Sequence, residues 1–357
     1  MKKSIWWVVG IVVILVLLIV LVSSRKATTP ATNVEKPFTI GAVLPLSGAA
    51  ALWGETVKNG MELALEGRPG IVAIYEDSKS TAADGVSAYN SLQNKGVDLT
   101  VSETSLVAVP LAKIALERKQ PLLVTLVATD HSKIVNEYTT RYYTDPTNYA
   151  MPAFNDPLSP VIKAKKIALL HRNDELGVAV KDKIVQLSSE NKKELVIQES
   201  FAPNEKDYRT LLTKIKNSKA DALVFIVANP IEAVGIVKMA NEIGIGMPMI
   251  EASAVFADLD TRKQAGTIQF YSTSYDFSLP GKAQDFKAKY QAKFNKEPNF
   301  GAAFGYDIAN LSDSCKAKKE SIKECLAGTD HMDGVAGTAT QILPGDFVVK
   351  MHIEKVN

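Results

Sequence analysis

The sequence predicts an α/β protein in which two lobes each carry a doubly wound parallel sheet. From Phe38 onward, short apolar runs alternate with amphipathic stretches. This alternation reaches about residue 125 and restarts at Lys166. Strands that alternate with helices form parallel sheets covered on both faces, and 357 residues are enough for two such units. Two successive runs therefore favour two similar lobes over one large sheet.

The N-terminal segment is predicted to span a membrane. An uninterrupted apolar run extends from Ile5 to Val22 after a short basic start. As a helix this run rises about 27 Å, close to the thickness of the hydrocarbon core of a bilayer. It exceeds the apolar core of about 7–15 residues that is typical of a secretory signal. Trp6 and Trp7 lie at its edge, where aromatic rings favour the interface. We assign residues 1–26 as a single-pass transmembrane anchor, with a cleaved signal as the alternative.

Residues 27–37 are predicted to form a flexible tether. The stretch around them is rich in Ser, Thr, Ala and Pro and has no apolar periodicity. An anchor and a cleaved signal both place the body outside the cytoplasm. We therefore expect a periplasmic or cell-surface body held at the cell membrane, or a secreted body if the signal is removed.

The first alternation predicts four strands and three helices. The strands are expected at Phe38–Leu44, Ile71–Tyr75, Leu99–Val101 and Pro121–Thr125, and the helices at Ala51–Glu66, Thr81–Asn94 and Val107–Lys119.

The second alternation predicts four strands and three helices again. The strands are expected at Lys166–His171, Leu195–Gln198, Ala222–Val227 and Met249–Glu251, and the helices at Val178–Ser189, Tyr208–Asn217 and Ile231–Ile243. In the second of these helices, apolar residues from Tyr208 to Ile215 follow the i, i+3, i+4, i+7 spacing of a helix face.

The pattern changes after a further strand at Gln269–Thr273. Helices are expected at Gly281–Asn295, Ala302–Lys318 and Glu320–Leu326, and Asp346–Glu354 resembles a hairpin strand. We infer a chain that crosses between the lobes more than once.

Composition and motifs exclude several classes of protein. The 41 Lys and Arg residues nearly balance the 39 Asp and Glu residues, so no nucleic-acid partner is indicated. The sequence has no Walker-type loop, no Gly-x-Gly-x-x-Gly motif after a strand and no Gly-x-Ser-x-Gly elbow. Its four histidines are scattered without metal-ligand spacing. We therefore expect no enzymatic activity, no cofactor and no metal site.

Small and hydroxyl-bearing residues follow three of the first-lobe strands. These clusters are Pro45–Gly48, Ser102–Ser105 and Ala128–Asp130. Parallel sheets bind ligands at the carboxyl ends of their strands, and hydroxyls and backbone N–H groups at helix N-termini suit a carboxylate. The alternative is that these residues only cap the helices that follow. Three clusters at one sheet edge favour a ligand site.

Motifs spread over the body resemble one known family. They are Ile40–Gly48 with Trp53-Gly54, Asn59-Gly60 with Glu62–Ala64, Pro121–Leu123 leading to Ala128-Thr129, Asn173-Asp174 with Gly177, Asp207-Tyr208, Ala220–Ala222, Phe304–Asp307 and Gly334–Gly337. In this order and spacing the chain resembles the type I periplasmic binding proteins of the leucine/isoleucine/valine-binding class, from Phe38 to Asn357. Where the family usually has Gly-Pro-x-Ser, this chain has Ser102–Ser105, and Leu176 stands where an aromatic ring often covers the ligand.

The resemblance implies two lobes joined by three crossovers, which we expect near Thr144–Asn148, Ser272–Tyr275 and Asp333–Val335. The first lobe would comprise residues 38–145 and 275–333, and the second residues 146–274 and 334–357. Only the closed form lets both lobes touch the ligand.

The resemblance also implies a set of ligand-binding residues. The carboxylate of an amino acid would meet Ser105 and Thr129 with the Ala128 backbone, beside Ser102 and Thr104. The remaining walls would come from Ser47 and Trp53 in the first lobe and from Asn229, Glu251 and Ser253 in the second.

Cys315 and Cys325 are the only cysteines, and we expect them to form a disulfide. An extracytoplasmic location favours oxidation, and some family members look similar in carrying a Cys pair between their last two helices. The alternative is two unrelated buried thiols.

The expected function is capture of a small polar ligand for an ABC importer, with an amino acid of the branched-chain type as ligand and a permease as partner. A sensor or adaptor of the same fold, acting on another membrane partner, is the alternative. An enzyme is the third possibility, and the sequence shows no catalytic pair for it.

Overall fold

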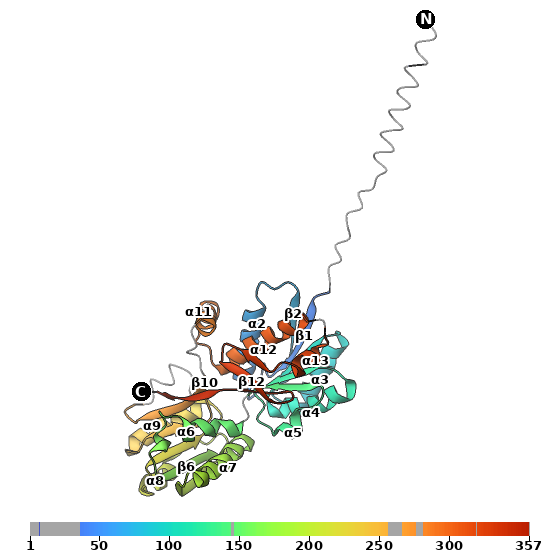
Figure 1. The fold of residues 1–357 in the computed structure, drawn as a ribbon. Coiled ribbons are helices and arrows are strands. Elements are labelled where there is room, and N and C mark those ends of the chain that lie inside the picture. The colour runs from blue at the N-terminus through green and yellow to red at the C-terminus, as the bar shows by residue number, and fades with distance from the viewer. Residues whose placement is uncertain are drawn as a thin grey trace. The chain divides into compact units, whose positions relative to one another are not determined.

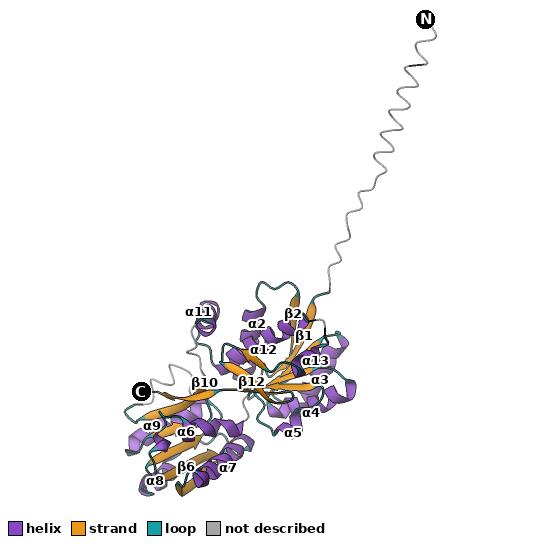
Figure 2. Cartoon of the chain, in the orientation of Figure 1, coloured by secondary structure: helices purple, strands orange, loops and turns teal. Residues whose placement is uncertain are grey.

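The strands of the body pair into two sheets, one in each lobe (Figures 1 and 2). The structure, a computed structural model, describes Trp7 and residues 36–143, 146–255, 266–275, 281–318 and 320–356. The chain divides into an N-terminal unit, Met1–Lys36, and the body, Pro37–Asn357. Within the described ranges, no helix combines the length and apolar character that crossing a membrane requires. The predicted anchor at 1–26 lies outside these ranges, Trp7 excepted.

The first lobe holds an eight-stranded sheet with the order β11-β12-β13-β5-β4-β3-β1-β2. Strands β1 to β5 are mutually parallel, and β13 lies parallel to β5. Strand β12 is antiparallel to both β11 and β13. The strands are β1 Phe38–Leu44, β2 Ile71–Asp77, β3 Leu99–Glu103, β4 Leu122–Thr125, β5 Thr139–Tyr142, β11 His331–Asp333, β12 Thr338–Leu343 and β13 Asp346–Val349.

Helices cover both faces of this sheet because successive strand residues point to opposite sides. Ala42 of β1 packs with apolar residues of two helices, and the next residue, Val43, packs with apolar residues of two others. The helices of the first pair are α2 Ala51–Leu65 and α12 Phe300–Lys316, and those of the second are α3 Ala82–Asn94 and α4 Ser105–Arg118.

Helices α2 and α12 touch through their backbones, although they come from opposite ends of the body (Figure 1). A Cβ on Gly60 would lie 1.9 Å from the carbonyl oxygen of Ala302, and a Cβ on Gly305 would lie 2.1 Å from that of Val57. Such distances leave no room for any side chain. Glycine on each helix is therefore what permits this close packing.

The second lobe holds a six-stranded sheet with the order β14-β10-β9-β8-β6-β7. Its strands are parallel except β14, which is antiparallel to β10. The strands are β6 Lys166–Arg172, β7 Glu194–Phe201, β8 Ala222–Ile226, β9 Met249–Glu251, β10 Phe270–Tyr275 and β14 Met351–Lys355. Leu169 packs against α7 (Glu175–Glu190), whereas Leu170 packs against α8 (Arg209–Asn217) and α9 (Pro230–Ile243). The predicted pair of doubly wound sheets is confirmed.

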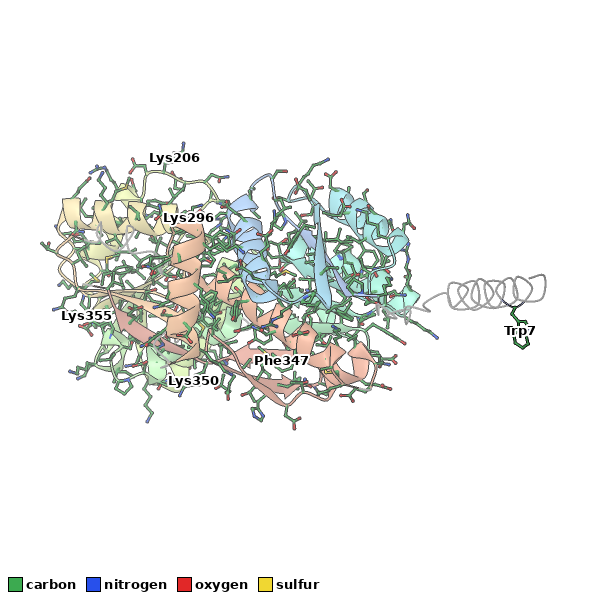
Figure 3. All side chains as sticks on the ribbon, turned by 90° about the horizontal axis from the view of Figure 1, so that it is seen from above. Trp7, Lys206, Lys296, Phe347, Lys350 and Lys355 are labelled. Carbon is green, nitrogen blue, oxygen red and sulfur yellow. A yellow bond between two sulfur atoms is a disulfide. The ribbon has the colours of Figure 1, made fainter. Side chains whose placement is uncertain are left out.

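The chain passes between the sheets at three places. It leaves the first sheet after β5, and the 3-10 helix η1 (Pro146–Ala150) and α6 (Met151–Asn155) lead to the second. It returns after β10, and it crosses again at Lys350, the residue between β13 and β14 (Figure 3).

One of the expected crossovers is placed wrongly. The crossing expected near Ser272–Tyr275 lies next to the observed one, because β10 of the second sheet ends at Tyr275 and the chain then returns to the first sheet. In contrast, the chain does not leave the first lobe at Asp333–Val335, because the strands that follow remain in the first sheet. The physical reason is a hairpin, since β12 and β13 pair with each other and β13 also pairs with β5. The hairpin expected at Asp346–Glu354 is thus two strands of different sheets.

The remaining helices are short or lie near the C-terminal part of the first lobe: α5 His131–Ile134, η2 Pro160–Ile162, α11 Lys282–Phe294 and α13 Ile322–Ala327. Cys315 near the end of α12 and Cys325 in α13 form a disulfide and are fully buried. The predicted disulfide is confirmed, and Figure 3 draws it as a yellow bond.

Candidate functional site

The carboxyl edge of the first sheet brings together two of the predicted hydroxyl clusters. Ser105 is the first residue of α4 and is separated from the end of β3 by Thr104 alone, and Ala128 lies in the loop after β4. The Ala128 N–H donates to Ser105 Oγ at 3.0 Å. We call residues 126–130 the β4 loop. This hydrogen bond fixes the β4 loop against the start of α4 and leaves the Ser105 hydroxyl proton for another acceptor.

Neither Ser105 nor Thr129 caps a helix. The N-cap of α4 is Thr104, which makes no side-chain capping bond and has a φ of +63°. The N-cap of α5 is Asp130, whose carboxylate accepts from the Ser132 N–H at 2.9 Å. The capping alternative is therefore wrong for these two hydroxyls.

Thr129 donates its hydroxyl to a carboxylate of the second lobe. Its Oγ1 lies 3.2 Å from Glu175 Oε1, and Glu175 is the first residue of α7. The Thr129 side chain is nearly fully buried, with 3% of the residue exposed. The hydroxyl therefore already has the geometry needed to bind a carboxylate.

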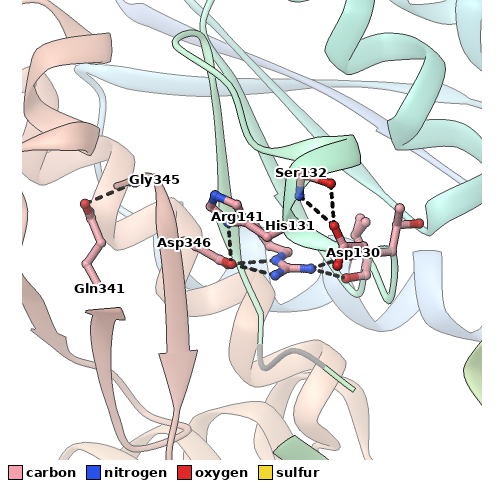
Figure 4. A network of polar contacts seen from close by, with 9 residues as sticks. Asp130, His131, Ser132, Arg141, Gln341, Gly345 and Asp346 are labelled. Atoms are coloured by element: carbon pink, nitrogen blue, oxygen red, sulfur yellow. Dashed lines mark hydrogen bonds and ion pairs between the residues drawn. The ribbon is translucent and has the colours of Figure 1, made fainter. Parts of the chain in front are cut away.

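Arg141 and Asp346 form a buried ion pair next to the β4 loop (Figure 4). Arg141 of β5 donates from Nε to Asp346 Oδ1 at 2.7 Å and from Nη2 to Asp346 Oδ2 at 2.6 Å. Its Nη1 donates to the carbonyl oxygens of Thr129 at 2.6 Å and Val127 at 3.4 Å. Nδ1 of His131, a half-buried side chain, lies 2.9 Å from Asp346 Oδ2. This pair lies outside the predicted site, because it joins residues 205 positions apart.

Ser47 and Trp53 lie on the segment after β1. The exposed Ser47 donates its N–H and its hydroxyl to Asp77, at 3.1 and 2.6 Å. The half-buried Trp53 lies 4.9 Å from Phe300 between ring centroids and contacts the apolar clusters of both lobes. Trp53 thus presents an apolar surface to both clusters, whereas the Ser47 hydroxyl already donates its hydrogen bond to Asp77.

The second-lobe residues predicted for the site are engaged within their own lobe. Asn229 caps α9 by accepting from the Glu232 N–H at 3.0 Å. Ser253 Oγ accepts from the Val227 N–H at 2.9 Å. Glu251 is fully buried and accepts from the Ser253 N–H and from Ser272 Oγ. Burial raises the pKa of Glu251 to about 7.

Glu103 is a polar residue of this edge that lies outside the predicted set of ligand-binding residues. It ends β3, it is fully buried, and neither of its carboxylate oxygens has a hydrogen-bond partner among the described residues. Burial raises its pKa well above the ordinary value. The hydroxyls of Ser102 and Thr125 beside it are likewise buried and unpartnered within the described chain. Unsatisfied buried polar groups of this kind are costly and concentrate at functional sites.

Comparison with known proteins identifies the family. The sequence profile described as "Periplasmic binding protein" matches residues 37–340. The Leu/Ile/Val-binding protein homolog 3 of Brucella melitensis is 28% identical over 198 residues, which cover 53% of this chain and 54% of that protein. The chain thus spans about half the length of the curated relatives that it matches.

Solved structures of low sequence identity share the fold. One is the branched-chain amino acid transporter substrate binding protein LivJ of Streptococcus pneumoniae, in complex with isoleucine. Its sequence is 24% identical to this chain, and its structure aligns with a TM-score of 0.77. The alignment covers 90% of this chain and 97% of LivJ. Another is a solute binding protein of an ABC transporter from Rhodopseudomonas palustris, in complex with 3,4-dihydroxy benzoic acid. It is 19% identical to this chain with a TM-score of 0.75, and the alignment covers 89% of this chain and 93% of that protein. With its two sheets, three crossovers and matching profile, the chain belongs to the periplasmic binding protein family, in the type I class of the leucine/isoleucine/valine-binding proteins.

Proposed function

We propose that the protein is an extracytoplasmic solute-binding protein that captures an amino acid of the branched-chain type between its lobes and delivers it to an ABC permease. The observation that carries the proposal is the pair of hydroxyls at the carboxyl edge of the first sheet. Neither Ser105 nor Thr129 caps a helix, and Thr129 already donates to a carboxylate. A ligand carboxylate would take the place of the Glu175 side chain on Thr129 and accept a hydrogen bond from the Ser105 hydroxyl.

The ligands of related proteins support a carboxylate more strongly than any particular side chain. Isoleucine and 3,4-dihydroxy benzoic acid, bound by the two relatives named above, share a carboxylate and little else. The apolar face of Trp53, which touches both apolar clusters, favours an apolar side chain on the ligand. A branched-chain amino acid satisfies both requirements.

The proposed site includes the other residues that the sequence analysis named. Ser102 lies in β3 and Thr104 lies between β3 and Ser105, and Ser47 and Trp53 would line the first-lobe wall. Asn229, Glu251 and Ser253 would support the second-lobe wall through the backbone segments that they bind.

The N-terminal run supports a location at the membrane. A helix over Ile5–Val22 is long enough to span the hydrocarbon core, and we propose that it anchors the body outside the cytoplasm beside the permease.

Calorimetry with the full chain in mild detergent tests the function. Wild type should bind leucine, isoleucine or valine, while Thr129→Val and Ser105→Ala should each weaken binding by about 10–100-fold, since a hydrogen bond to a charged group contributes about 1.5–3 kcal/mol. Ser321→Ala is the matched control, because Ser321 caps α13 and its hydroxyl bonds to Glu324 of the same helix. It should lower stability by about 1 kcal/mol and leave affinity unchanged. Absence of binding by wild type at millimolar amino acid would refute the proposed ligand.

A further inference from the structure

The ion pair between Arg141 and Asp346 joins β5 to β13 and also binds the backbone of the β4 loop. We propose that Arg141 and Asp346 are positioning residues, which hold Ala128 and Thr129 in the geometry that binds a carboxylate without touching the ligand themselves. The proposal rests on the function proposed above and adds to it two residues that lie outside the predicted site.

The Val127–Ala128 peptide is held from both sides. Its carbonyl oxygen accepts from Arg141 Nη1, and its N–H donates to Ser105 Oγ. The carbonyl oxygen of Thr129 accepts from the same Nη1 at 2.6 Å. The peptide units before Ala128 and after Thr129 are therefore fixed by one guanidinium, and Thr129 lies between them.

The loop needs this support because its backbone starts in an unfavourable conformation. Leu126, directly after β4, has a φ of +52°, in the left-handed region that side chains other than glycine rarely adopt. Such a conformation persists only where surrounding contacts impose it. Arg141 supplies such contacts one and three residues later.

Asp346 orients the guanidinium. It accepts from Nε and Nη2 in a two-bond arrangement, which directs Nη1 toward the loop. Asp346 is 1% exposed and pairs in register with Arg141 between β13 and β5. An apolar pair could fill the same space with similar stability, but it would leave the Val127 and Thr129 carbonyl oxygens without these donors. The ion pair therefore fixes the β4 loop, which an apolar pair could not do.

A paired substitution separates this role from general stability. Removing either charge alone leaves its partner buried and uncompensated, which destabilises the fold. Arg141→Met with Asp346→Leu removes both charges and keeps the bulk. Arg141→Lys is a second variant that keeps the charge but loses the planar fork. The control is Arg68→Met with Asp313→Leu, which removes an ion pair of the same lobe away from the loop.

Two measurements on the full chain test the proposal: isoleucine affinity by calorimetry, and hydrogen–deuterium exchange of the Ala128 amide without ligand. We expect both Arg141 variants to exchange Ala128 at least 10-fold faster and to bind isoleucine at least 10-fold more weakly. The control pair should change neither quantity. In a Thr129→Val background the loss of affinity should shrink, because Arg141 acts through Thr129.

Ala128 exchange and affinity equal to wild type in either folded Arg141 variant would overturn the proposal. Faster exchange in the variants, combined with a wild type that binds no amino acid, would refute the proposed ligand and leave the positioning of the loop supported. The two failures are therefore distinguishable.

Discussion

Substitution of Glu251 by glutamine should make the protein more stable at neutral and alkaline pH. Glu251 is fully buried at the end of β9, and burial raises its pKa from 4.5 to about 7. Ser272 Oγ lies 2.7 Å from Glu251 Oε2 and 3.0 Å from the Thr273 carbonyl oxygen. A hydroxyl has one proton, so a protonated Glu251 lets Ser272 donate to Thr273 and accept from the carboxyl. A glutamine amide makes the same set of bonds.

The sign follows from where the proton is bound. Above pH about 4.5 the unfolded chain has lost this proton, whereas the folded chain keeps it to about pH 7. The free energy of unfolding therefore falls as the pH rises between these two values. At about 1.4 kcal/mol per pKa unit, the loss from pH 5 to pH 8 is about 2–3 kcal/mol. Glutamine does not titrate, so Glu251→Gln should gain that amount relative to wild type over the same interval.

Chemical denaturation at pH 5, 6, 7 and 8 measures this difference. Asp307, whose pKa burial also raises to about 7, is present in both proteins, so its contribution cancels in the comparison. Glu117→Gln, at an exposed position of α4, is the matched control for the chemical change itself. A difference between Glu251→Gln and wild type that is equal at pH 5 and pH 8 would show that Glu251 is ionised throughout, and the reasoning would be wrong.

Three further predictions concern the rest of the chain. Cys315→Ala with Cys325→Ala should lower the free energy of unfolding by about 2–3 kcal/mol, because the disulfide closes a short loop, while calorimetry should show unchanged ligand affinity. Gly60→Ala should destabilise the first lobe by more than 2 kcal/mol, because its Cβ meets the Ala302 carbonyl oxygen. Thermal unfolding should show no such loss for Gly246→Ala, where a Cβ meets nothing within 4 Å. Protein extracted from membranes should retain residues 1–26, and an N-terminal sequence starting at or after Ser24 would contradict the anchor.

The sequence predicted best where apolar residues run continuously. The strand at Phe38–Leu44 has the predicted bounds, because a buried parallel strand needs apolar residues on both faces. Strand β5 was missed because its sequence, Thr-Thr-Arg-Tyr, looks polar. Its arginine is buried only because Asp346 comes from a strand far along the chain. Local patterns cannot show such a pairing.

The predicted first-lobe hydroxyls lie at the carboxyl edge of the first sheet, but the sequence could not distinguish the roles of similar side chains. Asn229 precedes a helix that starts with proline, and its side chain is committed to that helix as a cap. Ser105 also stands at a helix start, yet it holds the β4 loop instead. The different roles of Asn229 and Ser105 depend on the backbone conformation at Thr104, where φ is positive. Residue-type preferences do not predict that conformation. The roles of both residues toward a ligand stay predictions.

The glycine contact between α2 and α12 also affects when the first lobe can be completed during synthesis. Nearly all of the second sheet, β6 to β10, comes from one continuous stretch of chain, whereas the first sheet needs residues from Phe38 to Val349. During synthesis at about 5–20 residues per second, Gly305 would follow Gly60 by about 10–50 s. For that time the apolar face of α2 has no partner helix, so the lobe that begins the body is completed only after most of the second lobe has been made. A nascent chain stopped before α12 would expose that face to chaperones or to other copies of itself.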